Sequence, residues 1–182
     1  MSEHPPQRPS VPTVMQAVPW EGELPDRLRP LFADTNVQCQ TYLGQNFISL
    51  DVAVLFRLIS YLLNDEKFEM LTDVTAVDYP KDSARFEIIY ILYSFRMNQR
   101  VRVKTRISEA QGVPSLVPLF DAANWLEREV FDMFGIQFTG HPNLKRILMP
   151  DDWHGFPLRK DASIIGMDQE WVQKNLGIES GQ

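Results

Sequence analysis

The chain has 182 residues, which suits one domain with an appended tail. Hydrophobic residues make up 44% and charged residues 23%, as in ordinary soluble globular proteins. The formal net charge of −6 argues against a protein built mainly to hold nucleic acid.

The first 19 residues are predicted to form a flexible, proline-rich arm, because they contain five prolines. They also lack the apolar stretch of a signal peptide. No apolar run elsewhere approaches the roughly 20 residues that cross a bilayer. We therefore expect any work at a membrane to depend on a partner that holds the chain there.

Order is expected to begin near Trp20, with a short helix over residues 25–32. Two strands are predicted to follow, over residues 37–43 and 47–50. Asp51 can cap the next helix. The apolar residues of that helix recur at the spacing that places one face against a core: Leu55, Leu58, Ile59, Leu62 and Leu63.

Three further strands are predicted over residues 68–77, 86–95 and 100–107, the last two as an antiparallel hairpin. The strand over 86–95 is apolar on both faces, as central strands are. The last strand alternates strictly, so that four basic residues share one face: Arg100, Arg102, Lys104 and Arg106. That face is either a solvated surface, the commoner outcome, or a surface that meets an acidic partner.

A second strong helix is predicted over residues 121–134, after a short helical turn within residues 113–120. Asn124 and Glu127 have the spacing of a capping box at its start. Gly135 supplies its end, since glycine readily adopts the left-handed conformation found there.

The periodicity disappears after Phe138, and prolines interrupt a long irregular stretch before a short helix predicted over 168–176. The elements predict an α+β fold, an antiparallel or mixed sheet with helices packed on one side, followed by an extended C-terminal arm. Residues 20–138 would form the globular domain, and residues 139–182 the arm that binds a partner. A structureless stretch this long is uncommon in a self-contained domain, so we expect a neighbouring protein to order it.

Candidate metal ligands of suitable type lie near one another in sequence: Glu127, Glu129, His141, Asp151, Asp152 and His154. They follow no recognised ligand spacing, and two loop histidines that donate to backbone carbonyls are the commoner outcome. An independent metalloenzyme that uses His141, His154 and Asp152 remains an alternative. The sequence contains no phosphate-binding loop, dinucleotide fingerprint or nucleophile motif.

The spacing of the carboxylates on the second helix does not indicate a catalytic pair. Glu127 and Glu129 are two residues apart and cannot face each other on a helix. Arg128 and Asp132 have the i, i+4 spacing of an intrahelical ion pair. The single cysteine, Cys39, excludes an internal disulfide and any iron–sulfur cluster held by this chain alone.

The arm has the composition of an interface. It combines aromatic, arginine and aliphatic residues of the kinds that dominate binding energy: Arg146, Ile147, Leu148, Met149, Trp153, Phe156 and Arg159. Its prolines restrict the free chain and lower the cost of ordering it on a partner. The same residues would also suit an arm folded back on its own domain, and composition does not separate the two.

Residues 127–161, the signature segment, carry a family resemblance. The runs EREVFDMFGI at 127–136, GHP at 140–142, PDDW at 150–153 and GFPLRKD at 155–161 resemble the C subunit of respiratory complex I. This is the 30 kDa subunit of the proton-translocating NADH:quinone oxidoreductase. Lys145 stands where the family often has arginine, and Ala162-Ser163 replaces an aromatic-proline pair.

The resemblance implies a peripheral subunit on the cytoplasmic side of a bacterial inner membrane, packed against the quinone-site (D) subunit and near the B subunit. It implies no catalytic residue, cofactor or metal in this chain, although the complex uses FMN, iron–sulfur clusters, NADH and quinone. An equivalent subunit of a membrane-bound hydrogenase or of a ferredoxin- or F420-linked quinone oxidoreductase is the alternative. The interface and signature residues would be Glu127, Arg128, Glu129, Asp132, His141, Pro142, Arg146, Asp151, Asp152, Trp153, Phe156, Pro157, Arg159, Lys160 and Asp161.

Overall fold

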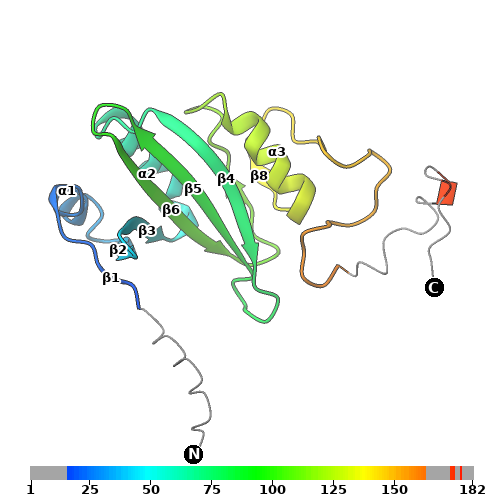
Figure 1. The fold of residues 1–182 in the computed structure, drawn as a ribbon, viewed down its shortest axis with the longest axis horizontal. Helices are drawn as coiled ribbons and strands as arrows, with labels where there is room; N and C mark the ends of the chain where they lie inside the picture. The colour runs from blue at the N-terminus through cyan, green and yellow to red at the C-terminus, as the bar shows by residue number, and fades with distance from the viewer. Residues whose placement is uncertain (1–15, 163–172, 175–176, 178–182) are drawn as a thin grey trace, which may run out of the picture.

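A six-stranded mixed sheet forms the centre of the protein, and the computed structural model describes residues 16–162, 173–174 and 177 (Figure 1). The strand order is β1-β2-β3-β6-β5-β4. Neighbouring strands are antiparallel except β3 and β6, which are parallel. The strands are β1 (Val18–Pro19), β2 (Gln38–Tyr42), β3 (Gln45–Leu50), β4 (Met70–Asp78), β5 (Phe86–Ser94) and β6 (Gln99–Ile107).

The central strands β5 and β6 form the antiparallel hairpin that the sequence predicts. β5 pairs with β4 on one side and β6 on the other, and the hairpin closes at the Ser94↔Gln99 pair. Every second residue of β5 is buried, because successive side chains of a strand point to opposite faces. These buried side chains face the helices and form the main part of the core: Phe86, Ile88, Tyr90 and Leu92.

Three helices within the described residues complete the fold: α1 (Glu23–Leu31), α2 (Val52–Asn64) and α3 (Ala123–Phe134). The predicted apolar stripe of α2 is buried at Leu55, Leu58, Ile59 and Leu62. α3 packs along β4, and the helices share one core with the sheet (Figure 1). The α+β class, with a mixed sheet and packed helices, is therefore confirmed. Among the described residues, no helix has the length and apolar character needed to cross a bilayer.

Several local predictions were wrong. Asp51 occupies the N-cap position of α2 in an extended conformation, but its side chain makes no capping hydrogen bond. β1 pairs with β2 through Val18↔Thr41, so regular structure begins inside the stretch predicted as a flexible arm. Residues 113–120 begin with an unpredicted strand, β7 (Val113–Pro114), and the predicted helical turn follows it, where Leu119 and Phe120 donate their backbone N–H groups to the Leu116 carbonyl.

β7 pairs in parallel with β8 (Phe138–Thr139) in a separate two-stranded sheet, which joins the chain before α3 to the chain after it. Val113 donates its backbone N–H to the Gln137 carbonyl, and Ser115 donates to the Thr139 carbonyl. Both bonds are 2.9 Å long. Pro114 lies between them, where its missing N–H is not needed.

The C-terminal segment, which we define as residues 140–162, contains no helix or strand, as predicted. It lies beside α3 (Figure 1), and Leu158 donates its backbone N–H to the Met133 carbonyl. This part of the arm therefore contacts its own domain, and the expectation that a neighbouring protein orders it stays a prediction. The helix predicted over 168–176 lies outside the described residues, except for helical positions 173 and 174.

Candidate functional site: a clasp between the C-terminal segment and the domain

Two sets of contacts, which together we call the clasp, hold the C-terminal segment to the domain: one around Asp132 and one around Asp78. The first half is centred on Asp132, a fully buried residue of α3. Its Oδ2 atom accepts three consecutive backbone N–H bonds, from Ile147 at 3.0 Å, Leu148 at 2.7 Å and Met149 at 2.9 Å. Successive N–H groups that converge in this way form an anion-binding concavity. Arg146 completes the set through a 2.7 Å bond from its Nη1 atom to Oδ1.

The pKa of Asp132 shows which effect dominates. Burial acts to raise the pKa of this carboxyl, but the hydrogen bonds from the three backbone N–H groups and from Arg146 outweigh burial and lower it. Asp132 is therefore an ionised carboxylate that holds the chain at residues 147–149. It is engaged on both oxygens and has no geometry for proton transfer.

Arg128 holds the same stretch of chain from the neighbouring face of α3. Its guanidinium donates to the carbonyls of Lys145 at 3.0 Å and Arg146 at 3.2 Å, and stacks over the ring of Trp125 at 5.0 Å. The predicted intrahelical pair between Arg128 and Asp132 is wrong, because both side chains turn toward the C-terminal segment.

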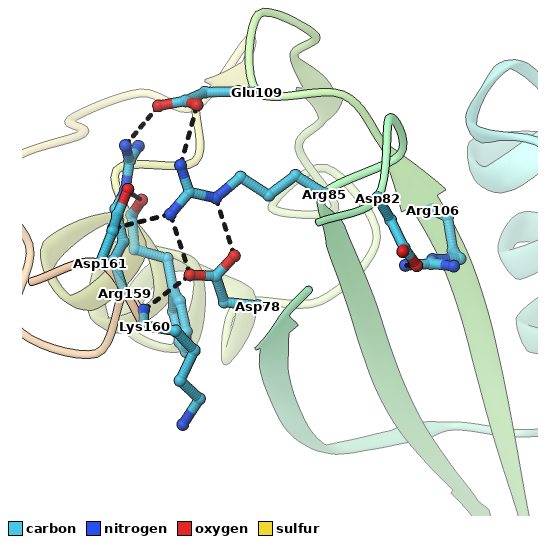
Figure 2. A network of polar contacts seen from close by, with 9 residues as sticks. Asp78, Asp82, Arg85, Arg106, Glu109, Arg159, Lys160 and Asp161 are labelled. Atoms are coloured by element: carbon cyan, nitrogen blue, oxygen red, sulfur yellow. Dashed lines mark hydrogen bonds and ion pairs between the residues drawn. The ribbon is translucent and has the colours of Figure 1, made fainter. Parts of the chain in front are cut away.

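The second half of the clasp surrounds Asp78, the last residue of β4 (Figure 2). The buried Asp78 carboxylate and Arg85 form a bidentate ion pair, with 2.8 Å from Nε to Oδ1 and 3.0 Å from Nη2 to Oδ2. Lys160 donates its backbone N–H to the same carboxylate at 2.8 Å. The Arg85 hydrogen bonds lower the pKa of Asp78, and the Lys160 N–H adds to this against the opposing effect of burial.

Two surface carboxylates extend this network outward (Figure 2). Arg85 contacts Glu109 at 3.0 Å and Asp161 at 2.7 Å. Arg159 also pairs with Glu109, and its Nε atom donates to the Phe134 carbonyl at 2.6 Å. One arginine from the domain and one from the C-terminal segment thus share Glu109, which ties the two parts together.

Gly135 provides the space in which the C-terminal segment crosses the end of α3. It adopts the left-handed conformation, with φ of 76°, and so ends the helix as predicted. A Cβ atom at this position would lie 2.5 Å from the Phe156 ring and 2.8 Å from Nη2 of Arg159. Phe156 also packs edge-on against Phe131 and lies under Arg146 and Arg159.

Glu127 is fully buried and serves a different contact. Its carboxylate accepts hydrogen bonds from the Ser115 hydroxyl and the Leu116 backbone N–H, both 2.6 Å long. Burial raises the pKa of Glu127 to about 7, although both hydrogen bonds act to lower it. The predicted capping box with Asn124 is wrong, because α3 begins at Ala123 without a side-chain cap and Glu127 points into the core.

His141 stabilises a loop. Its Nδ1 atom accepts the Asn143 backbone N–H at 3.0 Å, so its Nε2 atom donates to the Asn124 carbonyl, also at 3.0 Å. This bond to a backbone carbonyl is the outcome that we expected for a loop histidine. Among the described residues, no group of three or more histidine, cysteine, aspartate or glutamate side chains could hold a metal ion.

The other predicted site residues belong to the C-terminal segment, except Glu129, which lies on α3. Trp153 is buried, and Phe156 and Pro157 are half-buried. The remaining five are exposed on at least part of their surface: Glu129, Pro142, Asp151, Asp152 and Lys160. Whether any of these residues contacts a partner stays a prediction.

Sequence reasoning missed the three domain residues in the second half of the clasp: Asp78, Arg85 and Glu109. A signal for Asp78 was present, because it continues the alternation of the buried positions Val74 and Ala76 on β4. A carboxylate at an inward position needs a cation or hydrogen-bond donors. Glu109 had no such signal, since it lies in the exposed loop after β6.

The chain is similar in sequence to known respiratory subunits. Residues 48–167 match the family described as respiratory-chain NADH dehydrogenase, 30 Kd subunit. The NADH-quinone oxidoreductase C subunit of Hyphomonas neptunium is 44% identical over 148 residues, which cover 80% of this chain and 69% of that protein. The corresponding C subunit of Citrifermentans bemidjiense is 42% identical over 145 residues, 79% of this chain and 90% of that protein.

A solved structure shares the fold. A chain of the membrane-bound sulfane sulfur reductase, an archaeal respiratory membrane complex, superimposes with a TM-score of 0.67. The match covers 86% of this chain and 93% of that one, at 22% sequence identity. At this identity the likeness concerns the fold alone.

Proposed function

The chain belongs to the family of the 30 kDa subunit of respiratory-chain NADH dehydrogenase, and we propose that it is a non-catalytic peripheral subunit of a proton-translocating NADH:quinone oxidoreductase. It supports electron transfer from NADH to quinone by packing against the quinone-site (D) subunit, near the B subunit, on the cytoplasmic side of a bacterial inner membrane. FMN and the iron–sulfur clusters belong to other subunits of the complex.

One observation carries this proposal: the clasp uses its charges internally and leaves large apolar side chains exposed. Trp125 is 63% exposed, Leu148 59% and Leu158 50%. Arg128 stacks on Trp125 and also fixes the chain just before Leu148, so the two exposed side chains are held by the same residue. A rigid apolar surface of this kind favours binding, because little conformational freedom remains to be lost.

Affinity purification of the tagged full-length chain from its native membranes tests the proposal. We expect the D and B subunits to be recovered with it, together with NADH:quinone reductase activity. Leu148→Lys should reduce this recovery, whereas Leu31→Lys, at an exposed leucine of α1, should not. Recovery of the wild-type chain without any other oxidoreductase component would contradict the proposed function.

A related respiratory complex is the second candidate, supported by the shared fold with a chain of the archaeal sulfane sulfur reductase. Membrane-bound hydrogenases and ferredoxin- or F420-linked quinone oxidoreductases are complexes of this kind. The co-purifying electron-input subunits and the donor that reduces the purified complex distinguish them. The identities of 42–44% with subunits of NADH-quinone oxidoreductases favour NADH as the donor.

A further inference from the structure

The basic face of β6 is only half neutralised by the chain's own carboxylates. Lys104 lies 3.8 Å from Glu87, and Arg106 lies 2.9 Å from Asp82 (Figure 2). Arg100 and Arg102, at the start of the strand, have no carboxylate partner within the part of the chain that the structure describes. The chain has a net charge of −6, so these two arginines form a positively charged patch on a protein that is negatively charged as a whole.

Exposed apolar side chains gather at the same end of the sheet. Because β3 and β6 are parallel, the β2–β3 turn and the β5–β6 turn lie at one end, where β4 also begins. Four large side chains there are exposed by 42% to 65%: Tyr42, Leu43, Met70 and Phe95. Arginine together with aromatic and aliphatic residues is typical of the centre of a protein interface.

A hollow of about 370 Å³ lies between the two turns. Arg100 and Arg102 line it, together with Trp20 and the amide side chains of Asn46, Asn98 and Gln99. Guanidinium and amide groups donate hydrogen bonds in directions that suit a carboxylate. The hollow therefore offers a carboxylate two positive charges without a competing acid on this chain among the described residues.

This surface is separate from the clasp. Asp78 and Phe86 pair at the far end of the sheet, and β5 runs eight residue steps from Phe86 to Ser94, next to the hollow. At about 3.3 Å per residue, the two sites are roughly 26 Å apart. One partner segment that binds the clasp would have to span the full length of the sheet to reach both.

We propose that the end of the sheet formed by Arg100, Arg102 and the exposed apolar side chains around them binds an acidic segment of a second neighbouring subunit. The inference rests on the proposed function, since it requires a multi-subunit complex. A polypeptide fits better than a small anion, because a free phosphate would leave Leu43 and Phe95 in water. Complementary charge also speeds and orients docking.

The test compares charge reversals in the native complex. Arg100→Glu and Arg102→Glu are expressed separately as tagged full-length chains, and Lys81→Glu is the control. Lys81 is an exposed cation between β4 and β5, at the opposite end of the sheet. We expect each arginine variant to be incorporated about tenfold less than the control, since a like charge would face the partner's acid.

A photo-crosslinking residue at Gln99, a neutral residue at the hollow, gives a second measurement that does not depend on charge reversal. The expected product joins this chain to an Asp/Glu-rich segment of one identified subunit, and reversing that segment's acids should restore Arg102→Glu. If wild type enters the complex while both arginine variants match Lys81→Glu, the inference is wrong. It is equally wrong if Gln99 crosslinks only to lipid or to nothing. If wild type itself fails to enter, the proposed function fails instead.

Discussion

Lys160 donates its backbone N–H to the Oδ2 atom of Asp78, across 82 residues of sequence, at a distance of 2.8 Å. The bond uses the main chain of the signature segment, so it does not depend on the lysine side chain. It places Arg159 and Asp161, on either side, next to Arg85 and Glu109 (Figure 2). The charged end of the signature segment thus binds the chain's own domain.

Removal of the Asp78 carboxylate should destabilise the protein markedly. In Asp78→Ala, Arg85 keeps its surface partners but loses its buried one, and its side chain is only 11% exposed. Loss of one member of a buried ion pair costs about 3–5 kcal/mol. Because Glu109 and Asp161 still compensate Arg85, we expect about 3 kcal/mol, measured from urea unfolding of the full-length chain.

Asp82→Ala is the matched control for this prediction. Asp82 also pairs with an arginine, Arg106, but both side chains are well exposed, at 49% and 39%. Exposed pairs contribute within about 1 kcal/mol. Equal losses in Asp78→Ala and Asp82→Ala would show that the clasp does not depend on the buried carboxylate.

Asp132→Asn should release residues 147–149 without unfolding the sheet. The neutral amide accepts hydrogen bonds more weakly than the carboxylate, and a bond to a charged group is worth about 1.5–3 kcal/mol. We therefore expect the Ile147, Leu148 and Met149 amides to exchange with solvent about 10–100 times faster. Amides of β5 should keep their protection, and Glu129→Gln, on the exposed side of the same helix, should change neither set. Unaltered exchange in Asp132→Asn would show that the Asp132 carboxylate does not hold residues 147–149 in place.

Alanine substitutions at Gly135 and Gly44 distinguish the cost of backbone strain from the cost of a steric clash. Gly135 and Gly44 have nearly the same φ, 76° and 73°, but a Cβ atom at Gly44 would meet nothing within 4 Å. Alanine in this conformation costs about 1–2 kcal/mol at either site. At Gly135 the methyl group must also displace the Phe156 ring, which should add about 1–3 kcal/mol in urea unfolding. If the two variants lose the same stability, the Phe156 ring does not depend on the space at Gly135.

The elements with strong local periodicity could be predicted from the sequence. The apolar stripe of α2 and the alternation of β6 depend only on residues close in the chain, and both elements formed as predicted. The pairing of β7 with β8 could not be predicted, because it joins two-residue strands far apart in sequence and includes Pro114. Nothing local distinguishes such a strand from a turn.

The candidate site was predicted as a set of residues but not as a set of contacts. The capping box at Glu127 and the ion pair of Arg128 with Asp132 were inferred from spacing along an isolated helix. In the protein these three side chains point away from the helix, toward Ser115 and the C-terminal segment. Tertiary contacts outweighed spacing here, because buried charges take the strongest donors and acceptors within reach.

Glu127 should make stability depend on pH in the direction opposite to a paired carboxylate. Its pKa is about 7 in the folded chain, against an ordinary value of 4.5. Below pH 4.5 both folded and unfolded states are protonated, so the group has no cost. Between pH 4.5 and 7 the unfolded chain ionises while the buried carboxyl stays protonated, so folding stability falls across this range, and above pH 7 the loss is complete. The difference between the two pKa values corresponds to on the order of 3 kcal/mol.

Glu127→Gln removes this titration while keeping an amide that can bond with Ser115 and Leu116. The stability of the variant relative to wild type should therefore rise between pH 5 and pH 8, by roughly 2–3 kcal/mol in urea unfolding at each pH. Groups that titrate in both proteins cancel in this comparison. Glu129→Gln, exposed on the same helix, should show a difference that does not change with pH. A constant difference for Glu127→Gln as well would mean that Glu127 ionises normally, and that the Ser115 and Leu116 bonds offset its burial.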